Sequence, residues 1–160
     1  MAKLPPLSNT IVAELNAIRG GFNETIGLRF IRASYDEVVA EIELGPQHRQ
    51  PYGLVHGGVY AAMVETLASV GAAINLGALR LHTVGLDNTT SFLRAVRAGT
   101  LTGTARPLAR GRRTQVWEVG ITHDGDLVAT GRVRLLGLEQ GATMAGETVD
   151  FEHPGAPKGA

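Results

Sequence analysis

One acidic side chain stands inside a long apolar stretch of this sequence. Residues 54–76 read LVHGGVYAAMVETLASVGAAINL, and Glu65 is the only Asp, Glu, Lys or Arg between Arg49 and Arg80. A lone carboxylate among apolar residues costs free energy unless it is paired or used. Carboxylates serve enzymes as nucleophiles and as general bases. The sequence therefore makes Glu65 the first candidate for a catalytic residue.

The same stretch predicts a helix with two different faces. At 3.6 residues per turn, one face is a bulky stripe suited to packing on a sheet. This stripe comprises Val59, Met63, Leu67, Val70 and Ile74. The second face comprises Gly58, Ala61, Ala62, Glu65, Ser69 and Ala72. Its small residues allow another backbone or a ligand to come close. The simpler interpretation is that Glu65 faces water, but a water-facing surface would normally carry further charges.

The residues at the start of the helix predict a site for a carbonyl oxygen. The first N–H groups of a helix have no backbone partners and lie at the positive end of its dipole. Gly57 and Gly58 leave these groups unshielded, and His56 can donate a hydrogen bond to the same oxygen. A capping histidine followed by a tight turn explains each residue equally well when it is taken alone.

Gly57 and Glu65 are too far apart to act together on one carbonyl within one chain. Eight positions along a helix span about 12 Å. A base that acts through one water lies within roughly 6 Å of the carbon under attack. Two antiparallel copies of the helix, related by a two-fold axis, bring Glu65 of one chain to Gly57 of the other. We therefore expect a homodimer with two composite active sites.

The flanking residues predict the elements that hold this helix in place. We expect a short helix after residue 8, ended by Gly20 and Gly21, and then a strand pair that includes residues 37–44. After the long helix, consecutive strands are predicted at 81–96, 100–108, 114–123 and 127–136, with a hairpin signal at Asp124-Gly125. An apolar helix must be enclosed, and a curved antiparallel sheet is the simplest enclosure, which gives an α+β fold.

Composition excludes several classes of function. The 160 residues include no cysteine, which rules out disulfides and thiolate metal sites and suits a reducing cytoplasm. The histidines lack metal-ligand spacing, so we expect no metal, and without a phosphate-binding glycine loop we expect no cofactor. A net charge of +0 and an aromatic content of 5% argue against nucleic acid as a partner. Polar residues interrupt the long apolar helix, so we expect it to be buried and not in a membrane.

At the family level, QPYGLVHGGVYAAMVETLAS resembles the signature of hotdog-fold acyl-CoA thioesterases of the PaaI-like type. These include the 4-hydroxybenzoyl-CoA thioesterase of the glutamate-using branch. The segments NTTSFLRAVRAG and PLARGRRTQVWEVGITHDGDLVATGRVRL are also similar to this family. The resemblance implies a hotdog domain at residues 20–137, in which a curved antiparallel sheet wraps around one long helix. A tail with a short helix, 1–19, precedes it, and we expect a flexible tail at 138–160.

The resemblance also implies roles for five residues. Gln50 helps to hold the thioester carbonyl, and His56 lies beside it. The Gly57 N–H is the oxyanion donor. Glu65 of the opposite subunit acts as nucleophile or general base, and Ser69 orients a water molecule. Tetramers built as dimers of dimers are common in the family.

A run of arginines gives a candidate site for coenzyme A. Six lie between Asp87 and Glu118, where no acidic residue occurs: Arg94, Arg97, Arg106, Arg110, Arg112 and Arg113. Arginine binds phosphate in a two-pronged geometry, and coenzyme A carries three phosphates. Solvated strand faces are the simpler interpretation for most of them. The resemblance favours a CoA-binding turn and Arg94 as a second contact. The turn comprises Gly111, Arg112, Arg113 and Thr114.

We therefore predict a cytoplasmic acyl-CoA thioesterase that cleaves a CoA thioester, with aryl esters such as phenylacetyl-CoA favoured by the resemblance alone. Phe92 stands where the related proofreading enzymes of the enterobactin pathway have a histidine, which argues against a pocket for a phenol. Two alternatives stay open. A hotdog hydratase or dehydratase would use a histidine and an acid for proton transfer, and a non-catalytic acyl-CoA binding module would not need Glu65.

Overall fold

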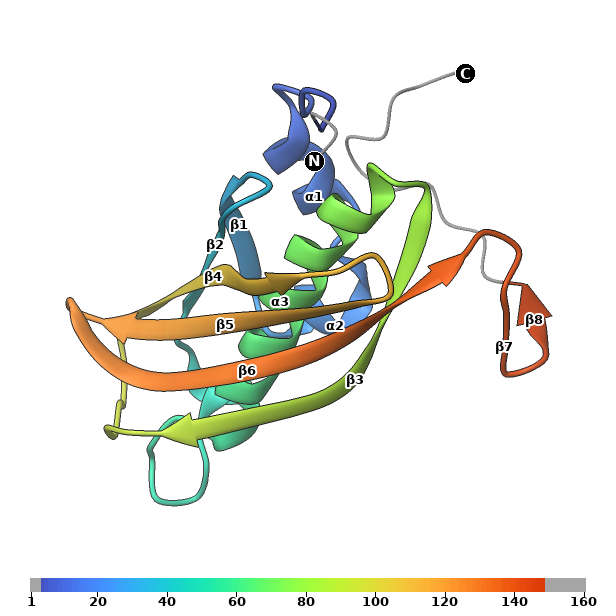
Figure 1. Ribbon diagram of the computed structural model, residues 1–160. Helices are drawn as coiled ribbons and strands as arrows, with labels where there is room; N and C mark the ends of the chain where they lie inside the picture. Colours follow the sequence, from blue (N-terminus) through green and yellow to red (C-terminus); the bar gives the residue numbers. More distant parts are fainter. Residues whose placement is uncertain (1–3, 149–160) are drawn as a thin grey trace.

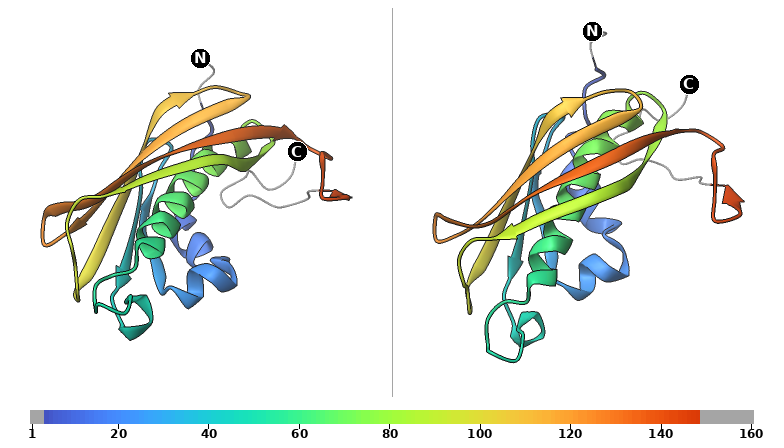
Figure 2. Two further views of the ribbon diagram at one scale, coloured as in Figure 1. Left: turned by 90° about the horizontal axis from the view of Figure 1, so that it is seen from below. Right: turned by 60° about the horizontal axis from the view of Figure 1, so that its bottom comes forward.

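A six-stranded antiparallel sheet encloses one long helix in the computed structural model of the protein, which describes residues 4–148 (Figure 1). The helical elements are α1 (Ile11–Ala17), α2 (Gly20–Thr25), the 3-10 turn η1 (Pro46–His48) and α3 (Gly57–Gly77). The sheet strands are β1 (Leu28–Ala33), β2 (Val38–Glu43), β3 (Leu81–Phe92), β4 (Thr100–Arg110), β5 (Thr114–His123) and β6 (Asp126–Glu139). Their order is β1-β2-β4-β5-β6-β3, so β1 and β3 are the edges. The predicted α+β hotdog arrangement is confirmed, since the sheet curves over α3 (Figure 2).

Helix α3 is the centre of the core because its sides are mostly apolar. The predicted stripe packs inward: Met63 and Leu67 are fully buried, and Val59 and Ile74 are nearly so. The sheet comes so close that a Cβ on Gly103 would lie 2.5 Å from the Leu67 side chain. This helix is long and apolar enough to cross a membrane, but most of it is buried in the protein, as predicted for a core helix.

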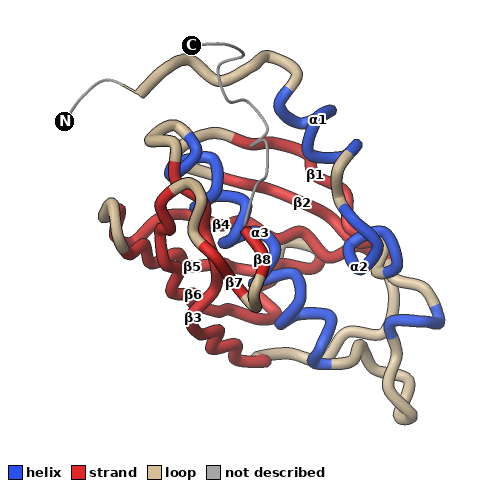
Figure 3. The backbone as a smooth tube through the Cα atoms, turned by 90° about the vertical axis from the view of Figure 1, so that its right-hand side faces the viewer, coloured by secondary structure: helices blue, strands red, loops and turns tan. Residues whose placement is uncertain are grey.

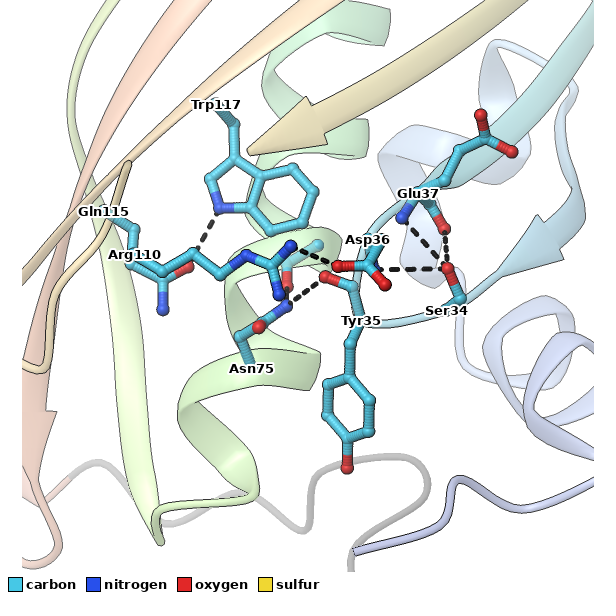
Figure 4. A network of polar contacts seen from close by, with 9 residues as sticks. Ser34, Tyr35, Asp36, Glu37, Asn75, Arg110, Gln115 and Trp117 are labelled. Atoms are coloured by element: carbon cyan, nitrogen blue, oxygen red, sulfur yellow. Dashed lines mark hydrogen bonds and ion pairs between the residues drawn. The ribbon is translucent and has the colours of Figure 1, made fainter. Parts of the chain in front are cut away.

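The C-terminal half of α3 is tied to the turn between β1 and β2 (Figure 4). Asn75 is buried, and its Nδ2 donates to the backbone oxygens of Tyr35 and Gly71, each at 2.9 Å. Beside it, Asp36 pairs with Arg110 at the end of β4. Most residues in the last turns of α3 are buried, and Ala72, which we expected on the small-residue face, is fully buried.

One prediction about the N-terminal region is wrong: Gly20 and Gly21 begin α2 and do not end the first helix, which stops at Ala17. The tail predicted from residue 138 overlaps the end of β6, which stays paired through Glu139, and the short hairpin of β7 (Thr143–Met144) and β8 (Glu147–Thr148) follows (Figure 3). The rest of the predicted tail, residues 149–160, lies outside the described residues.

Candidate active site

Glu65 belongs to α3, and its half-buried side chain lies against the edge strand β3. Its Oε2 accepts a hydrogen bond of 2.9 Å from Asn88 Nδ2 on β3. Its Oε1 accepts a longer one, 3.3 Å, from Ser69 Oγ one turn along the helix. A Cβ on Gly85 would lie 2.7 Å from Oε1, so glycine at that position leaves the oxygen its space. These contacts argue against the simpler interpretation of a carboxylate that only faces water.

At the N-terminus of α3 one backbone N–H group is free. His56 is the N-cap, with an extended backbone, and its Nδ1 accepts a 2.9 Å hydrogen bond from Gly58 N. The expectation that both glycines present open N–H groups is therefore wrong, because the capping ring uses one of them. Within residues 4–148 the Gly57 N–H has no partner. Since Nδ1 of His56 is an acceptor, its Nε2 carries the proton and can donate.

The aromatic ring of Phe92 lies beside Gly57, and that of Tyr60 lies beside Phe92. A Cβ on Gly57 would lie 2.8 Å from Cζ of Phe92, so the ring of Phe92 covers the glycine. Phe92 is 58% exposed, and its ring centroid is 5.8 Å from that of the buried Tyr60. The Tyr60 hydroxyl has no hydrogen-bond partner among the described residues, and burial raises the pKa of this phenol. An acyl group whose carbonyl bound at Gly57 would therefore meet an apolar, aromatic wall.

The loop that carries Gln50 is fixed by a buried histidine that the sequence did not single out. His48 Nδ1 accepts from Gly45 N at 2.8 Å, and its Nε2 donates to Ile26 O at 3.0 Å. The backbone oxygen of His48 also accepts from His56 N at 2.8 Å, which joins the loop to the start of α3. Gln50 is half-buried in this loop, and its side chain makes no hydrogen bond within the described part of the chain.

The structure does not bring Gly57 and Glu65 together within one protomer. Both lie on the uninterrupted helix α3, eight positions apart, which separates them by about 12 Å along its axis. The free Gly57 N–H and the Glu65 carboxylate therefore lie about two turns apart on the same helix.

The candidate CoA-binding arginines lie near the two opposite ends of β6, the strand labelled in Figure 1. Arg94 pairs with Asp126 at 2.6 Å, at the start of β6. Arg112 pairs with Glu139 at 3.0 Å, at the other end of the same strand. Those 14 residues span roughly 40 Å at the usual rise of a strand. One protomer therefore does not present Arg94 and the predicted turn to the same CoA molecule.

The predicted turn itself is a tight β4–β5 connection. Gly111 N donates to Thr114 O at 3.0 Å, and Arg113 O accepts from Gly137 N at 2.9 Å. Arg106 and Arg110 lie on β4 and are ion-paired, as in the simpler interpretation. Arg106 pairs with Glu37, which also pairs with Arg32.

Sequence reasoning missed Asn88 and Thr90, which complete the surroundings of Glu65. Thr90 Oγ1 donates to Asn88 Oδ1 at 2.7 Å. Both residues share a face of β3 with Phe92, since side chains alternate along a strand. This alternation could have placed them beside the helix, but it does not say which helix residue they meet. No group of three or more metal-ligating side chains occurs in residues 4–148.

Comparisons with known proteins agree with this fold. A profile of the Thioesterase superfamily matches residues 52–130. A Mycobacterium tuberculosis protein named provisionally as an esterase is 44% identical over 74% of this chain and 86% of its own length. Its solved structure has a TM-score of 0.72 and covers 74% of this chain, with 96% of that chain matched.

Two further relatives have more specific names. The 1,4-dihydroxy-2-naphthoyl-CoA hydrolase of Listeria monocytogenes is 35% identical over 65% of this chain and 84% of its own length. A solved thioesterase of Haemophilus influenzae has a TM-score of 0.76 at 28% identity, covering 87% of this chain and 96% of that one. The chain belongs to the Thioesterase superfamily and is a hydrolase of that superfamily with the hotdog fold.

Proposed function

We propose that the protein hydrolyses an acyl-CoA thioester to the free acid and coenzyme A in the cytoplasm. The observation that carries the proposal is the Glu65 carboxylate, held by Asn88 and Ser69 on the helix whose first N–H group, at Gly57, is free. The name of the Listeria relative, a CoA-ester hydrolase, supports coenzyme A as the thiol.

The hydrogen-bond donors and the carboxylate of this site have the chemistry that acyl transfer requires. The thioester oxygen accepts a hydrogen bond from the Gly57 N–H, with His56 Nε2–H and the Gln50 amide beside it, so that negative charge developing on this oxygen is stabilised. Glu65 then acts in one of two ways. It attacks the carbonyl carbon and expels the CoA thiolate, leaving a mixed anhydride that water cleaves. Alternatively it removes a proton from the water that attacks, and Ser69 helps to orient that water.

A second copy of the chain is needed to complete this site. The 12 Å between the two groups is about twice the reach of roughly 6 Å that a base has through one water. Strand β3 is an edge with unpaired backbone groups, and Leu86 and Phe92 on it and Leu93 directly after it are exposed. Two β3 strands that pair across a two-fold axis would cover these groups and turn the helices antiparallel. We propose this dimer, and a dimer of dimers as the larger assembly.

The same arrangement gives the arginine turn a role. The backbone oxygen of Arg112 lies 2.4 Å from the position of a Cβ on Gly137, and Leu76 of α3 lies 3.3 Å from it, so the turn is beside the C-terminal end of α3. In an antiparallel pair, that end of one protomer lies near Gly57 of the other. Arg94 of one subunit and the turn that carries Arg112 and Arg113 in the other subunit would then reach the same CoA molecule.

Thiol release from a panel of aryl, short-chain and long-chain acyl-CoA esters tests the proposal. Glu65→Gln should lower kcat by about 10²-fold or more while the protein stays folded, because the carboxylate is replaced by an amide that is no base. Glu43→Gln, at an exposed site on β2, is the matched control and should keep wild-type activity. Near-normal turnover by Glu65→Gln would contradict the proposal. A hydratase would release no thiol from a saturated ester, and a binding module would bind the esters without turnover.

A further inference from the structure

Asn88 contacts both the carboxylate of Glu65 and the helix turn that carries it. Its Nδ2 donates to Glu65 Oε2 at 2.9 Å and to the backbone oxygen of Ala61 at 3.1 Å. Ala61 lies four positions before Glu65, so its oxygen is the one that accepts the helical bond from Glu65 N. One amide group thus holds the reactive side chain and the backbone beneath it.

The Glu65 carboxylate and the Ala61 carbonyl set which way the amide of Asn88 points, and Thr90 holds it there. The Thr90 hydroxyl donates to Asn88 Oδ1 at 2.7 Å. A flipped amide would set its oxygen against the carboxylate and the Ala61 carbonyl, which have no proton to give. The NH₂ group therefore faces Glu65.

The two carboxylate oxygens have different surroundings. Oε2 receives the shorter bond from Asn88, whereas Oε1 has the 3.3 Å contact with Ser69 and the space left by Gly85. Strand β3 holds the backbone of Asn88 in place, because it is paired with β6 on both sides of this residue. Asn88 itself lies opposite Val133.

We propose that Asn88, oriented by Thr90, is a positioning residue that anchors Oε2 of Glu65 and leaves Oε1 as the oxygen that attacks or takes the proton. This rests on the proposed catalytic role of Glu65. A hydrogen bond to a carboxylate is stronger than one between neutral groups. Its loss lets the carboxylate rotate away from the reacting geometry, while substrate binding at Gly57 is untouched.

Three variants test the proposal in the thiol-release assay. Asn88→Asp has nearly the same shape but puts a negative charge where the donor was, Asn88→Ala removes the contact, and Thr90→Val removes only the orienting hydroxyl. We expect kcat to fall about 10- to 100-fold in both Asn88 variants, the cost of a misplaced catalytic group, and less in Thr90→Val. KM should stay within about threefold, since uniform binding is not lost. Thr89→Ala, on the opposite face of β3, is the matched control and should keep wild-type kcat.

A second measurement separates positioning from mere stabilisation. In a Glu65→Gln background, Asn88→Ala should cause no further loss of rate, because the two residues act as a unit. Wild-type kcat in Asn88→Asp, or an effect on KM alone, would overturn the positioning role. An active Glu65→Gln enzyme would instead overturn the proposed function, so the two failures are distinguishable. The nearly isosteric Asn88→Asp and Thr90→Val variants keep the test open if Asn88→Ala fails to fold.

Discussion

Gly57→Pro is the perturbation that isolates the proposed oxyanion donor. Proline removes the backbone N–H at the first position of α3, where this group has no partner among the described residues. Proline is favoured at this position of a helix, since its fixed φ is suited to the first turn. It also requires an extended preceding residue, and His56 already has φ −67° and ψ 135°. The capping bonds made by His56 stay in place.

The magnitude follows from the donor that is lost. We expect kcat of Gly57→Pro to lie about 10²–10³-fold below that of Gly57→Ala, the cost of one oxyanion-hole donor. Gly57→Ala is the matched control because it keeps the N–H and adds the same Cβ, 2.8 Å from Cζ of Phe92. The ring of Phe92 is 58% exposed and can move aside in either variant.

The assay is thiol release at saturating acyl-CoA, with circular dichroism and Tm as checks on folding. If both Gly57 variants fold and show the same kcat, the Gly57 N–H does not bind the oxyanion and the assignment is refuted. A fall in kcat for the proline variant alone supports it.

Two further predictions concern the scaffold. Burial raises the pKa of Glu37, but its two arginine partners outweigh burial and hold the pKa below the ordinary value of 4.5. The stability that these ion pairs contribute is therefore complete above the pKa that Glu37 has in the unfolded chain. It is lost as pH falls through the lower pKa of Glu37 in the folded protein. Glu37→Gln should therefore lower Tm at pH 7, and its difference in Tm from wild type should close in strong acid. Gly71→Ala should cost about 1–3 kcal/mol in urea denaturation through overpacking, since its Cβ would lie 2.5–2.8 Å from ring atoms of the buried Trp117; Gly21→Ala, with open space around it, should be nearly neutral.

Sequence patterns predicted the central helix and the hairpins because the signals there are local. The apolar run of α3 and the alternation of β5 each specify their own element. Asp124 and Gly125 form the two-residue turn between β5 and β6, with φ of 50° and 85°, as their residue types favour. Glu65 is likewise distinguished by its immediate neighbours, because it is the one charged residue in an apolar run.

The features that the sequence did not predict depend on contacts between residues far apart in the chain or on local backbone conformation. Gly20 has a φ of 74° and reverses the chain into α2, whereas a glycine pair alone suggests only the end of a helix. The end of β6 is a strand because it pairs with β3 as far as Glu139. Asn88 meets Glu65 across 23 positions of sequence, a contact that neither helical nor strand periodicity specifies.

The most direct test of the composite site is complementation between two inactive variants. Gly57→Pro protomers retain Glu65, and Glu65→Gln protomers retain the Gly57 N–H, so a mixed dimer has one intact site. Refolding equal amounts together should make half of the dimers mixed and restore about a quarter of wild-type kcat. Activity no higher than the average of the two separate variants, with mixed dimers shown to be present, would mean that both groups do not meet across a subunit interface.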